Sequence, residues 1–326
     1  MKRSDLDSCC GPAPRDRHIG RRQLLQGLMA LGGGLALSGC RAMAAPGQSS
    51  ASAATRMTGG KMSARWLGGG VMELATPDYK QIAYLDAWVW NNAGWDRFGV
   101  KKPAEYATRE GFVEYVKSKN PEAVLMLLTH DHGDHIGDYF EMLQGLSGAG
   151  VPVMTAGHGD FLRRGLGEQF KKVNLDPAKV VVNNGVSMNF GGAAKHGAMS
   201  LRLVPAVHST LAGFPPAGFI LDIGGMRAYL SGDTDLFGDM KTIGERYQPN
   251  VAMPCVGNGP FTMGPQEAAR ACQWLGVSQA VPIHFAHNNF VLGTGAGDDF
   301  QRALKEIASG VTTHVMKPGD TRLITT

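Results

Sequence analysis

The chain has 326 residues, of which 43% are hydrophobic and 18% are charged, so it is long enough for one large domain or two smaller domains with proper cores. The formal net charge of +4 equals the excess of seven basic over three acidic residues in positions 1–44, which leaves the rest of the chain neutral. A neutral body lacks the basic surface that nucleic acids require, so the composition argues against nucleic-acid binding.

The first 44 residues have the pattern of an export signal. Arg21 and Arg22 begin a twin-arginine motif, and the uncharged run 27–39 is too short and too rich in glycine for a good membrane span. This run leads to Cys40, in a Leu-Ser-Gly-Cys sequence that resembles a bacterial lipoprotein box, but a small-x-small cleavage site also lies at 42–44. We therefore expect export by the twin-arginine machinery to the periplasm, either with a lipid anchor at Cys40 or as a soluble form.

The body of the chain is predicted to be one α/β domain behind a linker. Residues 45–60 are rich in Ala, Ser and Gly, which indicates a flexible linker. Residues 61–326 alternate between strand-length apolar runs and helical periods, without a long charged or low-complexity segment. The cysteines of this domain, Cys255 and Cys272, are predicted to be small core residues rather than part of a disulfide framework.

The expected elements alternate along the domain. Strands are predicted at 71–75, 81–89, 123–128, 151–156, 179–182, 199–207, 251–256 and 280–283, with a hairpin over 219–231 and a closing strand pair near 314–316 and 321–324. Helices are predicted at 110–117, 138–146, 160–170, 236–247, 265–275 and 299–308. An early loop carries Trp88, Trp90 and Trp95, which either line the mouth of a substrate site or cover the core.

Metal-binding side chains are concentrated after the strand at 123–128. The motif His130-x-His132-x-Asp134-His135 would occupy the loop at the carboxyl end of this buried strand, the usual place for a site in a layered α/β fold. A solvated histidine-rich turn is the alternative, but the strand before the motif argues against it. Three further strand ends present one candidate each, and these are His208, Asp233 and His284.

In this order, the motifs closely resemble those of the metallo-β-lactamase fold superfamily of hydrolases over residues 61–326. The segments Ser-Gly-Asp-Thr-Asp-Leu-Phe at 231–237, Phe-Thr-Met-Gly-Pro-Gln-Glu-Ala-Ala at 261–269 and Pro-Ile-His-Phe at 282–285 are similar to those of a branch related to ascorbate-6-phosphate lactonase. The resemblance implies a four-layered αββα sandwich with a two-metal site at the shared edge of its two sheets.

The resemblance also implies a role for each candidate. The first metal would be bound by His130, His132 and His208, and the second by Asp134, His135 and His284, with Asp233 as the bridging carboxylate; Asp134 and Asp233 would be catalytic. Imidazole and carboxylate donors suit two divalent ions, with zinc first and manganese or iron as alternatives. Two such ions can hold a hydroxide between them and lower the pKa of bound water towards about 7.

The predicted function is an exported metal-dependent hydrolase of small molecules that cleaves a lactone or ester, since true β-lactamases of this superfamily lack the bridging aspartate. The alternatives are a phosphodiesterase acting on phospholipid head groups or nucleotides, and a non-catalytic metal-binding lipoprotein. Near the ligands, the chain departs in two places from the proteins that it resembles. Asp86-Ala87 stands where they commonly have Asp-Pro, and the run Phe-Ala-His-Asn-Asn at 285–289 stands where they usually have an aromatic residue and a threonine after the last ligand. We therefore expect the substrate-binding residues to be His287, Asn288, Trp88 and Trp90, and the absence of a basic cluster favours a neutral or amphipathic substrate.

Overall fold

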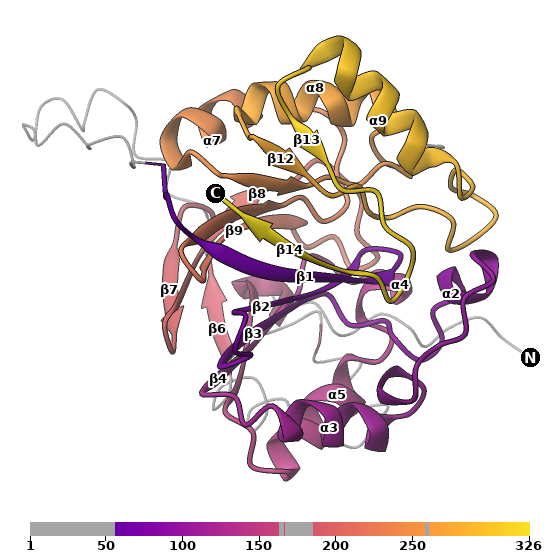
Figure 1. The fold of residues 1–326 in the computed structure, drawn as a ribbon. Helices are drawn as coiled ribbons and strands as arrows, with labels where there is room; N and C mark the ends of the chain where they lie inside the picture. Colours follow the sequence, from indigo (N-terminus) through magenta and orange to yellow (C-terminus); the bar gives the residue numbers. More distant parts are fainter. Residues whose placement is uncertain (1–55, 163–165, 167–184, 258–260) are drawn as a thin grey trace, which may run out of the picture. The chain divides into compact units, whose positions relative to one another are not determined.

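The computed structural model describes residues 56–162, 166, 185–257 and 261–326. These residues form two mixed β-sheets that pack face to face, with helices on the outer side of each sheet (Figure 1). The predicted four-layered αββα sandwich is therefore confirmed. The predicted export signal, most of the predicted linker, the strand at 179–182 and most of the helix at 160–170 lie outside the described residues.

The first sheet has an antiparallel and a parallel half. Its strand order is β14-β1-β2-β3-β4-β5-β6, with antiparallel pairing from β14 to β3 and parallel pairing from β3 to β6. The central strands are buried on both faces, which explains their short, nearly continuous apolar runs. The strands are β1 (Lys61–Gly68), β2 (Val71–Ala75), β3 (Gln81–Leu85), β4 (Ala123–Leu127), β5 (Val153–His158), β6 (Gly185–Met188) and β14 (Thr321–Thr325).

The second sheet has the order β13-β12-β11-β10-β9-β8-β7. The predicted hairpin is confirmed as β9 and β10, which are joined by Gly224 and Gly225 with φ values of 58° and 75°. Glycine adopts two such values in succession without strain, and a two-residue turn of this kind matches the twist of the strands. The strands are β7 (Ala193–His196), β8 (Met199–Pro205), β9 (Ala217–Ile223), β10 (Met226–Leu230), β11 (Val251–Met253), β12 (Gln279–Ala280) and β13 (Thr312–Thr313).

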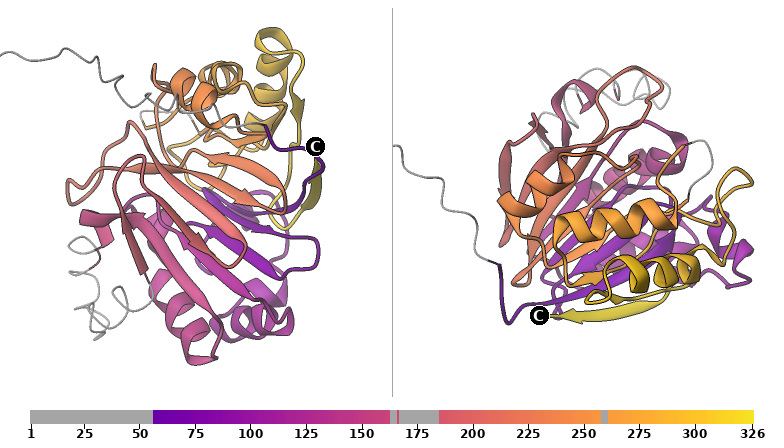
Figure 2. Two further views of the ribbon diagram at one scale, coloured as in Figure 1. Left: turned by 90° about the vertical axis from the view of Figure 1, so that its left-hand side faces the viewer. Right: turned by 90° about the horizontal axis from the view of Figure 1, so that it is seen from above.

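The helices divide between the two outer layers. The first sheet is covered by α3 (Arg109–Ser118) and α5 (Tyr139–Gly148), and the second by α7 (Met240–Tyr247), α8 (Pro265–Leu275) and α9 (Ala296–Ile307), of which α8 packs beside both neighbours (Figure 2). The short helices are α2 (Gly94–Arg97), η1 (Ala104–Tyr106) and α4 (Gly133–Ile136). Among the residues that the structure describes, no helix combines the length and apolar character that crossing a membrane requires.

The described residues form two apolar core clusters. One fills the space between the sheets and continues beneath α7, α8 and α9, and the other lies between the first sheet and the helices α3 and α5. Cys255 and Cys272 are buried and free, which confirms that they are core residues. The packed layers leave the loops at the strand ends as the place where polar side chains can gather.

The structure corrects several expected elements. The predicted strand at 321–324 is confirmed as β14, but its predicted pairing is wrong, because β14 pairs with β1 in the first sheet. The other predicted strand, near 314–316, is also wrong, because the strand there is β13 at Thr312–Thr313, which pairs with β12 in the second sheet. The strand expected at 81–89 ends at Leu85, because Asp86 adopts a left-handed φ of 56° and turns the chain towards the metal-binding motif. Residues 56–60, at the end of the predicted linker, make hydrogen bonds that include Asn250 Nδ2 to Met57 O at 2.9 Å.

Candidate metal centre

The seven predicted ligands lie together at one end of the two sheets. His130 and His132 follow β4, and Asp134 and His135 lie on the short helix α4 directly behind them. The other three, His208, Asp233 and His284, follow β8, β10 and β12. These strands run in the same direction, because β8 and β10 are both antiparallel to β9 between them, and β10, β11 and β12 are parallel to one another. The topology therefore brings together side chains that are up to 154 positions apart.

Three histidines and Asp233 form the first potential metal-binding group. His132 Nδ1 lies 2.9 Å from His130 Nε2 and 3.3 Å from His208 Nε2. Asp233 Oδ2 approaches the same group, at 3.6 Å from His208 Nε2. Ligands of one ion at about 2.0–2.2 Å are separated by such distances, so the geometry fits a single divalent metal.

His135, His284 and Asp233 form a second potential group. Asp233 Oδ1 lies 3.3 Å from His135 Nε2 and 3.1 Å from His284 Nε2, and the two imidazole nitrogens are 3.2 Å apart. Asp233 therefore faces one group with each carboxylate oxygen. Its Oδ1 is buried and has no hydrogen-bond partner among the described residues, which is the environment of an anion that binds a cation.

Partners behind the ligands fix the orientation of three imidazole rings. Asp86 Oδ2 lies 2.7 Å from His135 Nδ1 and also accepts a hydrogen bond from the hydroxyl of Thr129 at 2.9 Å. Since the Thr129 proton goes to Asp86, its oxygen is free to accept from His130 Nδ1 at 3.0 Å. His208 Nδ1 donates to a backbone carbonyl at 3.0 Å. Each ring thus directs Nε2 towards the cluster, as metal-binding histidines generally do.

Asp86 supports the candidate ligands, a position that the sequence analysis missed. It was noted only as a departure from the Asp-Pro pair of the relatives, yet it is fully buried and organises two ligand histidines. A carboxylate at the end of a strand adjacent to the motif strand was the available signal. Asp131 has a similar supporting role, because its two oxygens accept hydrogen bonds from Leu211 N and Ala212 N at 2.8 Å and hold the loop that carries His208.

The glycine-rich turn between β1 and β2 packs directly against the ligands. A Cβ at Gly70 would lie 2.8 Å from His135 Cε1, so no other residue fits without displacing that ring. Gly69 O accepts a hydrogen bond from His284 N at 2.7 Å. His284 itself has a left-handed φ of 62°, an uncommon conformation for a non-glycine residue that is found most often at functional sites.

The electrostatics of the cluster suit metal binding. Burial lowers the pKa of His130 well below its ordinary value, so this imidazole is neutral at pH 7 and has a free lone pair. Burial acts to raise the pKa of Asp233, but His284 and His135 outweigh it and hold that pKa far below its usual range. Burial also acts to lower the pKa of His135, yet Asp233 and Asp86 raise it well above normal. The carboxylates of Asp233 and Asp86 therefore stabilise a positive charge in this part of the cluster.

The cluster opens into a cavity of about 250 Å³. Besides five of the predicted ligands, its walls contain Phe261, Asn288 and Val291, and no lysine or arginine is among the described lining residues. Phe261 is 47% exposed and packs edge-to-face against Phe290, which is 69% exposed. The mouth of the site therefore combines a polar floor with an apolar rim.

The expected substrate-binding residues fall into different places. Asn288 lines the cavity, although its Oδ1 also accepts hydrogen bonds from two backbone amides of the following turn. Trp88 packs edge-on against the ring of His287, whose Nε2 lies 3.1 Å from Asp134 Oδ2. Trp90 packs against Phe112 and the core beneath the first sheet, so the core-covering alternative describes its position. The structure thus brings His287, Asn288 and Trp88 to the cluster, but not Trp90.

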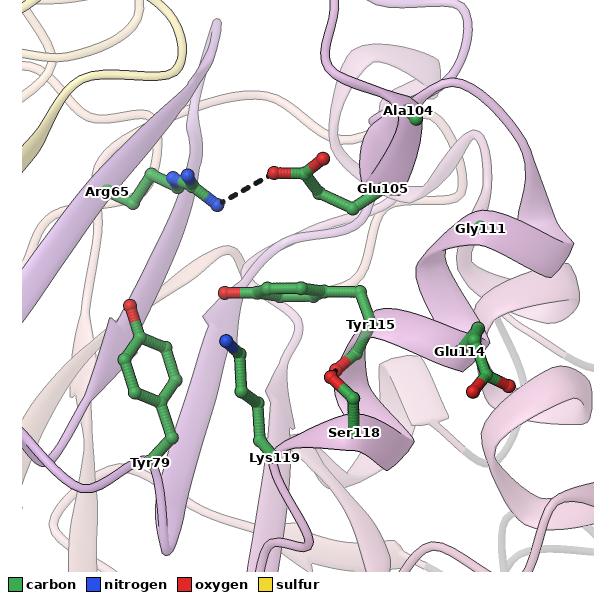
Figure 3. A pocket seen from close by; sticks show the side chains of 9 residues that line it. All are labelled: Arg65, Tyr79, Ala104, Glu105, Gly111, Glu114, Tyr115, Ser118 and Lys119. Carbon is green, nitrogen blue, oxygen red and sulfur yellow. Dashed lines mark hydrogen bonds and ion pairs between the residues drawn. The ribbon is translucent and has the colours of Figure 1, made fainter.

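A larger cavity of about 570 Å³ lies elsewhere, against α3 and β1 (Figure 3). Arg65 pairs there with Glu105 at 3.5 Å, and the ammonium group of Lys119 lies between the rings of Tyr79 and Tyr115. None of the described residues that line this cavity is a histidine or a cysteine. Every group of three or more potential metal ligands found among the described residues includes at least one residue that lines the smaller cavity, which is therefore the candidate site.

Comparisons with known proteins agree with this geometry. Residues 87–285 match the model of the beta-lactamase superfamily domain. A UPF0173 metal-dependent hydrolase of Pyrobaculum neutrophilum is 32% identical over 79% of this chain and 98% of its own length, and one of Cupriavidus metallidurans is 32% identical over 79% and 83%. The solved structure of Igni18, a metallo hydrolase of Ignicoccus hospitalis, superimposes with a TM-score of 0.62 at 24% identity, over 81% of this chain and 98% of that one.

Proposed function

Because the chain belongs to the metallo-β-lactamase superfamily and to its UPF0173 metal-dependent hydrolase family, we propose that its site binds two divalent ions and hydrolyses a neutral or amphipathic lactone or ester. The observation that carries this proposal is the position of Asp233. Its two oxygens face two separate groups of imidazole nitrogens, and its Oδ1 has no hydrogen-bond partner in the described part of the chain. A bridging carboxylate has this arrangement.

The donor set fits divalent metals. His130, His132, His208 and Asp233 would supply nitrogen and oxygen donors to one position. His135, His284 and Asp233 would supply them to the other, and Asp134 would join them there because its Oδ2 lies 3.7 Å from His284 Nε2. Mixed imidazole and carboxylate ligands suit zinc, with manganese or iron as alternatives, whereas calcium requires mostly oxygen. When bound, two such ions supply an activated water near neutral pH and neutralise negative charge that develops on the substrate.

The residues of the chain determine what else occurs at the site. Hydrogen bonds from His284 and His287 outweigh the effect of burial and hold the pKa of Asp134 far below normal, so Asp134 stays ionised. Asp134 and Asp233 both line the cavity, where Asp233 would hold the two ions and Asp134 is placed to accept a hydrogen bond from a water molecule directed towards a substrate carbonyl. Asn288 lies on the same wall, where its amide is placed to contact the polar end of a substrate.

The rim supports the proposed substrate class. Four of the six exposed large hydrophobic residues among those described lie on the loops around the cavity, and these are Val207, Leu211, Phe261 and Phe290. Apolar side chains at the mouth favour an acyl or aromatic portion on the substrate. A phosphomonoester would instead be expected to contact arginine or lysine, which the described lining lacks.

Purified protein should therefore be stripped of metal, reloaded separately with zinc, manganese and iron, and assayed against a neutral lactone, an aryl ester, a phosphodiester and a sugar phosphate. We expect hydrolysis of the lactone or the ester, and little or none by an Asp233→Asn variant. Turnover of the sugar phosphate or the phosphodiester alone would overturn the proposed substrate class. Metal loading without hydrolysis of any of the four substrates would favour a non-catalytic metal-binding protein.

We also propose that the enzyme acts in the periplasm, either as a lipoprotein anchored at Cys40 or as a soluble protein. The support is the twin-arginine pattern at Arg21 and Arg22 followed by the uncharged run 27–39. Twin-arginine export transports folded proteins, so the metals would be inserted in the cytoplasm. An apolar rim around the site suits substrates with a lipid-like portion, which are available near a membrane surface.

A further inference from the structure

We propose that His287 is an additional protein ligand of the metal ion bound by Asp134 and His284, an inference that rests on the proposed two-metal site. The sequence analysis expected His287 to contact the substrate. Asp134, His284 and His287 instead form a third group whose potential ligand atoms all lie within 4.8 Å of one another. His284 belongs to both this group and the group with His135 and Asp233, so one ion near His284 Nε2 can draw ligands from both.

Burial separates a metal ligand from a substrate contact. The side chain of His287 is 0% exposed, whereas that of Asp134 is 28% exposed. His287 is also absent from the residues that line the cavity, although Asp134, His284 and Asn288 are all present. A substrate in the cavity therefore cannot touch the imidazole of His287 without a rearrangement, but an ion held behind the cavity wall can.

The distances match those between ligands of one ion. With metal–ligand bonds of about 2.1 Å, adjacent ligands are about 3.0 Å apart in an octahedral site and about 3.4 Å apart in a tetrahedral one. His287 Nε2 lies 3.1 Å from Asp134 Oδ2, and His284 Nε2 lies 3.7 Å from the same oxygen. The separations between His135, His284 and Asp233 are 3.1–3.3 Å, so His287 extends the same pattern.

The backbone between His284 and His287 is bent in a way that directs both rings to the same point. His284 and Ala286 both have left-handed φ values, of 62° and 53°, and the ring centroids of His284 and His287 are 4.4 Å apart. Non-glycine residues in this conformation cost free energy and persist where the surrounding structure requires them. Here Ala286 N donates to Leu292 O at 2.8 Å, and the edge of Trp88 packs against His287.

The immediate consequence is an asymmetric pair of metal positions. The position near His284 gains a fifth protein donor beside Asp134, His135, His284 and Asp233, whereas the position near His208 has four donors. A more fully coordinated ion is held more tightly and has fewer open positions for a substrate. Trp88 is then a positioning residue, which keeps the His287 ring in place rather than contacting the substrate.

The test measures metal binding rather than activity alone. Full-length wild type, His287→Ala, His287→Gln and a His314→Ala control are stripped of metal and titrated with zinc against a chelator, and the cobalt-loaded forms are compared by visible absorption. His314 is a suitable control because its Nε2 contacts Gln279 Oε1, a residue outside the metal-binding groups. The glutamine variant is informative because its amide can donate a hydrogen bond to Asp134 but is a poor zinc ligand.

We expect both His287 variants to bind one of the two zinc ions about tenfold to hundredfold more weakly, the range seen when a group that supports a metal is removed. Their cobalt spectra should change in intensity as a ligand is lost, while His314→Ala matches wild type. Wild-type affinity and an unchanged cobalt spectrum in the His287→Gln variant would overturn the proposal. If wild type itself binds no divalent metal, the proposed function fails, which is a separate outcome.

Discussion

The close approach of Gly70 to the ligand histidines gives a quantitative test of the site. A Cβ added at Gly70 would lie 2.8 Å from His135 Cε1, 3.2 Å from His135 Nδ1 and 3.4 Å from His284 Cδ2. Carbon atoms that are not bonded pack best at about 3.5–4.0 Å, so a methyl group there overlaps the His135 ring by about 0.7–1.2 Å. Gly70 does not have a left-handed φ, and Gly70→Ala therefore introduces this overlap without backbone strain.

His135 has little freedom to move away. Its Nδ1 lies 2.7 Å from Asp86 Oδ2, and its Nε2 lies 3.3 Å from Asp233 Oδ1. Overpacking of this kind costs about 1–3 kcal/mol. The overlap displaces the ring from the position in which its Nε2 faces Asp233 and His284. We therefore expect the cost to be seen as weaker binding of the ion held by His135 and His284, by about fivefold to 150-fold at 1.4 kcal/mol per factor of ten.

The assay is a zinc titration against a chelator, and Gly133→Ala is the matched control. Gly133 lies in the same ligand motif, but a Cβ there would have no neighbouring atom within 4 Å. The control should match wild type in zinc affinity and stoichiometry, whereas Gly70→Ala should still bind two zinc ions, one of them weakly. Equal zinc affinity in wild type and Gly70→Ala, or equal losses in both variants, would refute the placement of His135 among the ligands.

Three further results are expected. Asp86→Asn should weaken metal binding about tenfold to hundredfold while the protein stays folded, which elemental analysis and circular dichroism together would check. Burial raises the pKa of Tyr84 well above 10.0, so this tyrosine stays neutral in the folded protein at a pH where it ionises in the unfolded chain. The free energy of unfolding should therefore fall above pH 10, by up to about 1.4 kcal/mol per pH unit for such a tyrosine, and urea unfolding at pH 9 and pH 11 would measure the loss. Replacing Arg21 and Arg22 by lysine should retain unprocessed protein in the cytoplasm, and Cys40→Ser should release a soluble periplasmic form, with fractionation and blotting as the readout; membrane association of processed Cys40→Ser would exclude the lipid anchor.

Much of the fold was predictable because its central strands are buried on both faces. Such strands appear in the sequence as short apolar runs, and β2 was predicted with its observed bounds. The strand β1 was missed, although the alternate residues Met62, Ala64 and Trp66 all belong to the core between the sheets, because Ser63 and Arg65 lie between them and interrupt the apolar run. The pairing of β14 with β1 depends on contacts 256 or more positions apart, which local patterns do not encode.

The candidate ligands were predictable because each follows a strand end, whereas the residues behind them were not. Asp86 and the ligand it holds, His135, are 49 positions apart, and only the parallel pairing of β3 with β4 makes them neighbours. His287 was identified as a residue near the metals, but its complete burial depends on a bend at His284 and Ala286 that their side chains do not predict. Trp88 and Trp90 are two positions apart and both pack against the core, yet only Trp88 also contacts a ring of the cluster, that of His287.

The most direct test of the two-metal hydrolase is a reconstitution titration. Metal-free protein is mixed with increasing zinc, and hydrolysis of the best lactone or ester substrate is measured at each ratio, for wild type and for Asp233→Ala. We predict no hydrolysis without metal, a rise that reaches its plateau at two equivalents in wild type, and folded but nearly inactive Asp233→Ala at every ratio. Full hydrolysis by the metal-free protein, or wild-type activity in the Asp233→Ala variant, would contradict the account.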